Sequence, residues 1–147
     1  MITFERLTAL LDRFPRLTVG LVGDLFLDRY LEIPRGAEEC SIETGLEAYQ
    51  VTRVRNSPGA LGTVINNLAA LGVGTIRPVT VIGDDGHGYD LLQSLASLPV
   101  DTRHILRSAQ RLTPTYTKPL RQGADGVWQE LHRLDVRTRA PLDRETL

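Results

Sequence analysis

The chain has 147 residues, which is the length of one ordinary domain with room for a sizeable core. Hydrophobic residues make up 41% of it and charged residues 24%, values that exclude a disordered protein. The net charge of −1 gives no electrostatic reason to expect nucleic acid or an anionic membrane surface as a partner.

The N-terminus and the cysteine content bear on location. Residues 1–13 carry two acidic and two basic side chains and no continuous apolar run, so they are neither a signal peptide nor a membrane span. The single cysteine, Cys40, rules out an internal disulfide and suits a reducing compartment. We therefore expect a soluble, cytoplasmic protein that has neither a membrane nor nucleic acid as its partner.

The chain begins with a predicted helix and a predicted buried strand. Apolar residues along 4–14 share one helical face, and Thr3 is a candidate N-cap. Residues 17–23 are a nearly continuous apolar run, which is typical of a strand buried on both faces in a parallel sheet. Asp24 follows directly, and Asp28 comes four residues later. Polar residues beyond the carboxyl end of such a strand are where open α/β sheets bind ligands.

The next segment has weaker periodicity. Residues 35–45 are expected to form a loop, and residues 48–55 a strand with Tyr49, Val51 and also Arg53 as candidates for one face. We interpret residues 31–56 as a small, partly exposed excursion from the main domain.

Residues 56–72 predict a glycine-bearing loop that leads directly into an amphipathic helix. Pro58 and Gly59 are typical of the turn, and Gly72 is placed to end the helix as a left-handed cap. Thr63 and Asn67 are four residues apart and share a polar face. The apolar stripe has the helical spacing i, i+3, i+4, i+7 and consists of Leu61, Val64, Ile65 and Leu68. Such a helix start lets a polar ligand approach backbone N–H groups, although an ordinary core helix explains the pattern as well.

A second strand, helix and strand follow. Residues 75–82 predict another buried strand, residues 83–88 a glycine-rich turn, and the next residues a helix that ends at Pro99. Residues 100–106 predict a third strand. Strands and helices that alternate at this spacing predict βαβ units and a parallel sheet.

The C-terminal part departs from this alternation. Residues 113–118 and 127–135 are rich in strand formers and flank a turn at 123–126, which predicts a β-hairpin. Residues 141–147 predict the start of a helix with Asp143 as its N-cap.

Five short motifs, in order along the chain, carry a resemblance to a known family. They are Gly23-Asp24…Asp28-Arg29-Tyr30, Pro58-Gly59…Asn67…Leu71-Gly72, Gly83-Asp84-Asp85…Gly88, Thr115…Thr117-Lys118 and Arg133-Leu134-Asp135. With these motifs the chain resembles the PfkB (ribokinase-like) carbohydrate kinases. Among them it is most similar to the bacterial heptose-phosphate kinases of the ADP-heptose pathway, which share the Gly-Asp-x-x-x-Asp-Arg-Tyr start. The similarity runs from about residue 17 to residue 135, nearly the whole chain.

The resemblance implies an α/β fold with a three-layer ribokinase-like parallel sheet, a small β lid and a β-hairpin. It also implies phosphorylation of a sugar or sugar-phosphate hydroxyl that depends on ATP and Mg. Asp24 would accept hydrogen bonds from sugar hydroxyls, and Gly59 would let the substrate lie close to the backbone. Asn67 or Thr63 would face the same pocket. The lid strands would lie within residues 29–55 and, as often in this family, could pair across a homodimer.

Asp28, Ala60 and Lys118 complete the predicted substrate contacts. The family usually has Gly-Gly before the helix, and Ala60 stands at the second of these positions, which removes freedom at positive φ. The family asparagine that contacts sugar falls on Thr63, which keeps a hydroxyl and loses the amide. Lys118 could reach a substrate phosphate from the hairpin, although a solvated strand face explains it as well. For Asp28, pairing with Arg29 is the alternative to ligand contact.

The second half of the family's domain has no counterpart in the sequence. These kinases are roughly twice this length, and their Gly-Ala-Gly-Asp type motif supplies an anion hole and the aspartate that acts as general base. No such motif occurs in residues 1–147. We therefore expect residues 1–147 to be an incomplete ribokinase-like domain, the sugar-side half. We expect it to have no catalytic, cofactor-binding or metal-binding residues, and to bind neither ATP nor Mg alone.

Two other interpretations stay open: a non-catalytic sugar-binding or dimerisation module, or one half of a split kinase. One acidic cluster has metal-ligand residue types, yet a glycine-rich turn with a helix cap explains it more simply. Its members are Asp84, Asp85, His87 and Asp90. Cys40 lies in a predicted loop without an evident histidine partner, so we do not expect a nucleophile there.

Overall fold

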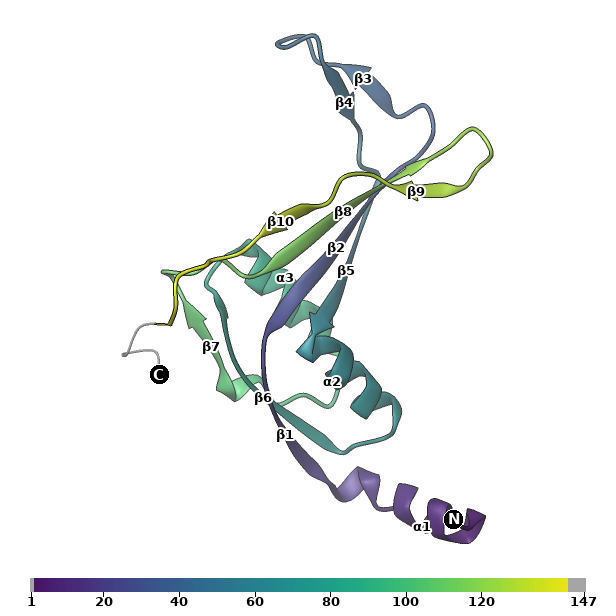
Figure 1. Ribbon diagram of the computed structural model, residues 1–147, viewed down its shortest axis with the longest axis vertical. Coiled ribbons are helices and arrows are strands. Elements are labelled where there is room, and N and C mark those ends of the chain that lie inside the picture. Colours follow the sequence, from purple (N-terminus) through teal and green to yellow (C-terminus); the bar gives the residue numbers. More distant parts are fainter. Residues whose placement is uncertain (1, 143–147) are drawn as a thin grey trace.

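The computed structural model describes residues 2–142 as a mixed α/β fold with two sheets and a separate β-hairpin (Figure 1). Sheet A is parallel, in the order β1 (Thr18–Val22), β6 (Thr75–Gly83), β7 (Ile105–Ser108). Sheet B has the order β10 (Leu134–Val136), β8 (Thr115–Gln122), β2 (Leu25–Ile33), β5 (Arg53–Ala60), and β9 (Trp128–Glu130) also pairs with β8. The separate hairpin consists of β3 (Glu38–Cys40) and β4 (Glu47–Tyr49). The helices are α1 (Phe4–Leu11), α2 (Leu61–Ala70) and α3 (Gly86–Leu95), with 3-10 helices η1 (Phe14–Arg16) and η2 (Thr102–His104).

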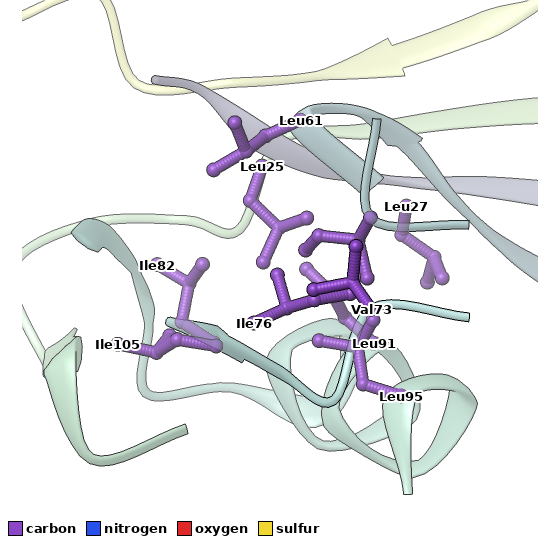
Figure 2. Packing of buried hydrophobic residues seen from close by; sticks show 10 residues of the cluster. Leu25, Leu27, Leu61, Val73, Ile76, Ile82, Leu91, Leu95 and Ile105 are labelled. Carbon is purple, nitrogen blue, oxygen red and sulfur yellow. The ribbon is translucent and has the colours of Figure 1, made fainter. Parts of the chain in front are cut away.

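The buried core gathers side chains from both sheets and from α2 and α3 (Figure 2). Leu25 and Leu27 come from β2, Ile76 and Ile82 from β6, and Ile65 from α2, and each is at most 1% exposed. Burying one such side chain completely stabilises a fold by about 1.5–3 kcal/mol. This cluster therefore holds the two sheets together, and it confirms the predicted α/β class.

The predicted amphipathic helix is confirmed as α2. Leu61 and Ile65 are buried, whereas Val64 is 43% exposed, so the buried stripe is narrower than the sequence pattern. Gly72 adopts φ +82°, and its N–H donates to the carbonyl oxygen of Ala69, as expected of a left-handed cap. The buried stripe of α2 faces the core.

Sheet A has one covered and one open face. The parallel pairing of β1 with β6 is confirmed and places Val22 beside Val79. The prediction that β1 is buried on both faces is wrong, because Val22 is 84% exposed. Val79 and Leu106 are 46% and 47% exposed and line the same cleft as Val22. These residues come from all three strands of the sheet, so within residues 2–142 this face is open to solvent.

The prediction of a loop before α2 is also wrong. The strand β5 continues through Pro58 and Gly59 and pairs antiparallel with β2, which places Pro58 opposite Leu27. Proline lacks a backbone N–H and is tolerated here because β5 lies at the edge of sheet B. The turn from strand to helix is confined to Ala60.

Other boundaries also differ from the predictions. The helix over residues 4–14 ends at Leu11, and Pro15 lies in η1, since the residue before a proline avoids the helical conformation. The predicted loop 35–45 contains β3. The hairpin of β8 and β9 is confirmed, and Asp143 lies outside the described residues. None of the helices in residues 2–142 has the length and apolar character that a membrane crossing needs.

Candidate functional site

Asp24 lies between β1 and β2, where the chain passes from sheet A to sheet B. Its backbone oxygen accepts a hydrogen bond from the N–H of Leu61 at 2.9 Å, which joins the end of β1 to the first residue of α2. Its side chain is exposed and lines a cavity of about 440 Å³ together with Val22, Val79 and Arg111. Asp24 thus lies beyond the carboxyl end of a parallel strand and lines a cavity, and its contact with a ligand stays a prediction.

The start of α2 has an unusual backbone. Ala60 adopts φ +49° and ψ −107°, and among the described residues it is the only non-glycine residue with positive φ. This conformation is strained for any side chain with a Cβ atom. Ala60 also provides no side-chain hydrogen bond to the helix. The N–H of Leu61 donates to the backbone oxygen of Asp24, and the start of α2 has no capping side chain.

Gly59 packs against two side chains of β2. A Cβ atom added to it would lie 2.7 Å from the Oδ2 atom of Asp28 and 2.8 Å from the nearest ring carbon of Phe26. These distances are too short for any larger residue without a shift. The groups that approach Gly59 closely are therefore side chains of the protein itself, Asp28 and Phe26.

Asp28 and Lys118 form an ion pair between β2 and β8. The Nζ atom of Lys118 donates to the Oδ1 atom of Asp28 at 2.7 Å and to the hydroxyl of Tyr30 at 3.3 Å. The two charged side chains are only 21% and 18% exposed. Burial lowers the pKa of Lys118, but the hydrogen bonds to Asp28 and Tyr30 outweigh it and raise the pKa above its ordinary value.

Aromatic rings and cations alternate across this side of sheet B. The register places Arg55, Tyr30 and Lys118 in one row across β5, β2 and β8. Arg55 and Lys118 each lie 4.8 Å from the centroid of the Tyr30 ring. In the neighbouring row, the Tyr116 ring contacts Phe26 edge to face at 4.9 Å. Side chains alternate along a strand, so this polar face of β2 lies opposite the face that carries the buried leucines.

Thr63 and Asn67 both lie on the exposed side of α2. Within residues 2–142 no hydrogen bond joins either side chain to another group. Asp24 and Asp28 are about 13 Å apart along the chain, at about 3.3 Å per residue of strand. The structure thus brings Asp24 together with Ala60, and separately Asp28 with Gly59 and Lys118.

The aromatic part of this surface was not predicted from the sequence. Phe26 and Tyr30 alternate with the buried leucines of β2, and that alternation could have identified them as a second face. Tyr116 lies beside Asp28 only through the pairing of β2 with β8. These two strands are far apart in sequence, and their pairing leaves no local signal.

The acidic cluster near α3 has structural partners. Asp85 caps the helix: it accepts hydrogen bonds from the N–H of Gly88 at 2.7 Å and from the N–H and hydroxyl of Thr113 at 2.9 and 2.7 Å. Burial raises the pKa of Asp85, but these hydrogen bonds outweigh it and lower the pKa below its ordinary value. Asp84 pairs with Arg107. The helix-cap interpretation is confirmed.

A third carboxylate of that cluster belongs to the packing of α3. Asp90 pairs with Arg29 of β2 at 2.7 Å, which ties the helix to sheet B. Asp28 therefore pairs with Lys118 and leaves Arg29 to Asp90. Cys40 is exposed on β3.

Comparisons with known proteins find relatives over most of the chain. No family model matches it. It is 34% identical to the bifunctional protein HldE of Pelobacter propionicus over 125 residues, which are 85% of this chain and 24% of that protein. It is 38% identical to HldE of Methylobacillus flagellatus over 127 residues, again 85% of this chain and 24% of that protein. The chain spans about a quarter of the length of the curated relatives it matches.

Two solved structures share its fold. A carbohydrate kinase from Agrobacterium tumefaciens matches 80% of this chain and 34% of its own length, with a TM-score of 0.57 and 21% identity. Arabidopsis thaliana ribokinase, solved with ribose and ATP, matches 81% of this chain and 35% of its own length, with a TM-score of 0.53 and 20% identity. The chain is therefore a homologue of HldE proteins over most of its length and has part of the ribokinase-like fold of PfkB carbohydrate kinases.

Proposed function

We propose that the chain provides the sugar-binding side of an ATP-dependent carbohydrate kinase, which transfers a phosphoryl group to a hydroxyl of a sugar or sugar phosphate. The observation that carries this proposal is the position of Asp24. It lies at the carboxyl end of β1, faces a cavity of about 440 Å³, and is joined through its backbone to the start of α2. The homology to HldE and the ribokinase-like fold support the same function.

In this proposal Asp24 binds and orients the sugar. A carboxylate accepts two or more hydrogen bonds, so it can hold neighbouring hydroxyls in one orientation. Phosphoryl transfer depends mainly on such positioning and on electrostatic stabilisation of the phosphates. Thr63 and Asn67 lie on the exposed side of α2, where they would contact the substrate.

The predicted residues Asp28, Gly59 and Lys118 would contact the substrate farther along sheet B. Phe26 and the rings of Tyr30 and Tyr116 offer apolar surfaces on which a sugar ring can pack. Lys118 is paired with Asp28, so it would bind a substrate phosphate only by exchanging that partner. With β3 and β4, this end of sheet B would form the lid over the sugar.

The carboxylates of the described residues do not fit Mg. Three aspartates that could coordinate a cation are each committed to a partner: Asp28 to Lys118, Asp85 to Thr113, and Asp90 to Arg29. Asp24 alone does not make the set of oxygen ligands that Mg needs. We therefore assign ATP and Mg to parts of the kinase outside this chain and derive no step through them.

A homodimer through the lid strands belongs to the same proposal. At the tip of the hairpin of β3 and β4, Ile42 is completely exposed and Leu46 is 69% exposed. Apolar side chains that project from a protein in this way favour contact with a second copy. With a net charge of −1 and a single cysteine, the chain fits a cytoplasmic protein whose partner is a small molecule.

The open face of sheet A bears on the split-kinase candidate. The face with Val22, Val79 and Leu106, next to Asp24, would receive the rest of the kinase domain, whether that part continues in the same chain or belongs to a second chain. Reading the gene beyond codon 147 distinguishes a continuous kinase from a split kinase. An in-frame Gly-x-Gly-Asp motif favours one continuous kinase, whereas a stop codon favours a split kinase or a binding module.

The kinase proposal is tested with the product of the entire reading frame. That product is incubated with ATP and a panel of sugars and sugar phosphates, and ADP release is measured for each. We expect turnover with at least one of them. No ATP turnover above the sugar-free background with any member of the panel would overturn the proposal.

A further inference from the structure

The hairpin of β3 and β4 is attached to the rest of the fold in an unusual way. We call residues 37–50 the arm. It projects beyond the end of sheet B (Figure 1), and its strands pair with each other and not with sheet B. The N–H of Gln50 donates to the oxygen of Ala37 at the base of the arm, and that of Thr52 to Glu32 of β2. Within residues 2–142, no backbone hydrogen bond joins residues 38–49 to either sheet.

One arginine of sheet B contacts both strands of the arm. The Nε and Nη2 atoms of Arg121 lie 2.9 and 2.7 Å from the Oε1 atom of Glu38 on β3. Its Nη2 atom lies 3.4 Å from Glu47 on β4, and its guanidinium lies 5.3 Å from the centroid of the Tyr49 ring. The hydroxyl of Tyr49 donates to Glu47 at 3.0 Å, which completes the cluster. Arg121 therefore joins the arm to β8 by charge.

Packing contributes little to this attachment. A cleft of about 530 Å³ separates the base of the arm, at Arg35 and Gly36, from the turn between β8 and β9. One long hydrogen bond of 3.4 Å, from Arg35 to the oxygen of Ala124, spans it. The apolar side chains Ile42 and Leu46 of the arm are exposed instead of covering sheet B. The arm is thus held over a cleft and not against a packed surface.

The ion pairs of Arg121 are of the kind that form and break easily. The side chains of Arg121 and Glu47 are 38% and 47% exposed. Exposed ion pairs are weak and are screened by salt. The Glu38 pKa is lowered by its own backbone N–H and by Arg121, in agreement with a charged contact.

We propose that the arm is a hinged element with a docked and a released position, and that Arg121 determines which of them is populated. The hinges are residues 34–36 and 51–52, which connect the arm to β2 and β5. In the docked position Glu38, Glu47 and Tyr49 contact Arg121. In the released position these contacts are broken, and the cleft beneath the arm opens. The proposal does not depend on a sugar or on ATP.

The chain provides its own reporters for this motion. Its single cysteine, Cys40, is exposed on β3 of the arm, and its single tryptophan, Trp128, lies on β9 opposite Gln122, next to Arg121. A fluorophore that accepts energy from tryptophan is attached to Cys40. The efficiency and lifetime distribution of energy transfer from Trp128 then measure the position of the arm in the whole chain.

The main variant is Arg121→Met, with Arg103→Met as a matched control because Arg103 pairs with Asp101 away from the arm. We expect Arg121→Met to lower the mean transfer efficiency and broaden the lifetime distribution, and Arg103→Met to behave as the parent chain. Raising the salt concentration should lower the efficiency of the parent and leave Arg121→Met unchanged. An Arg121→Met chain with the parent's efficiency and lifetime distribution at low salt would overturn the proposal.

A second variant keeps the test decisive if Arg121→Met fails to fold. Glu38→Gln combined with Glu47→Gln removes the two carboxylates from the arm and leaves β8 intact. We expect the same lower and broader energy transfer, with an unchanged far-UV circular dichroism spectrum. Unchanged energy transfer in this double variant would equally contradict the hinged arm.

Discussion

The backbone N–H of Leu61 donates a hydrogen bond to the backbone oxygen of Asp24 at 2.9 Å, so the first turn of α2 begins at the end of β1. This single contact brings together two segments that the sequence places almost forty residues apart. It places Asp24, which lines a cavity of about 440 Å³, next to the first residue of α2.

Ala60 is expected to weaken the fold through its backbone. Its φ of +49° suits glycine, so Ala60→Gly should raise the free energy of unfolding by about 1 kcal/mol. Urea unfolding measures the change. Ala70→Gly is the control, since Ala70 lies in α2 with ordinary helical geometry, and glycine there should lower stability by up to about 1 kcal/mol. A loss of stability in Ala60→Gly would contradict the strain at this position.

Gly59 should tolerate no side chain. An added Cβ atom would lie 2.7 Å from Asp28 and 2.8 Å from Phe26, so Gly59→Ala should lower the free energy of unfolding by about 1–3 kcal/mol. Gly20→Ala is a matched control in β1, because no atom lies within 4 Å of its added Cβ. We expect Gly20→Ala to change stability by less than about 1 kcal/mol in either direction. Equal effects of the two substitutions would refute the close packing at Gly59.

Asp85 should make stability depend on acid pH. Its pKa is lowered in the folded chain, so its contribution is fully present above the ordinary aspartate pKa of about 3.9 and is lost as pH falls through the folded value. Asp85→Asn should lower stability by about 1–2 kcal/mol at pH 7. The gap to the parent chain should shrink as the pH is lowered from 6 to 3.

The measurement is thermal unfolding followed by circular dichroism across that pH range. Asp84→Asn is the control, because the side chain of Asp84 is half exposed and pairs with Arg107 at the surface. Its effect should be small at every pH. A gap between Asp85→Asn and the parent that stays constant from pH 6 to pH 3 would contradict the role of the charged cap.

The sequence was sufficient for the parts of the fold that local pattern determines. The apolar run that became β1, the amphipathic stripe of α2 and the cap at Gly72 all follow from periodicity and glycine chemistry. The strand through Pro58 and Gly59 could not be predicted, because these residues favour a turn locally and only their pairing with β2 extends them. Tertiary pairing outweighed local preference there.

Likewise, some parts of the candidate site could be predicted from the sequence and others could not. The place of Asp24 after a strand of the parallel sheet was predictable because that strand is recognisable in the sequence, whereas its contact with a ligand stays a prediction. The ion pair of Asp28 with Lys118 was not predictable, because β2 and β8 are separated by more than eighty residues. Exposure of Val22 was also unpredictable, since burial of an apolar strand depends on which elements pack on each face of its sheet.

The most direct test of the proposed function is the effect of Asp24→Asn on sugar phosphorylation by the product of the entire reading frame. Loss of charged hydrogen bonds to the sugar should lower kcat/KM for the sugar by about 10- to 100-fold, and KM for ATP should change much less. Asp12→Asn, an exposed residue just after α1, should leave both constants unchanged. A kcat/KM for the sugar that stays at the parent value in Asp24→Asn would contradict the assignment of Asp24 as the sugar-binding carboxylate.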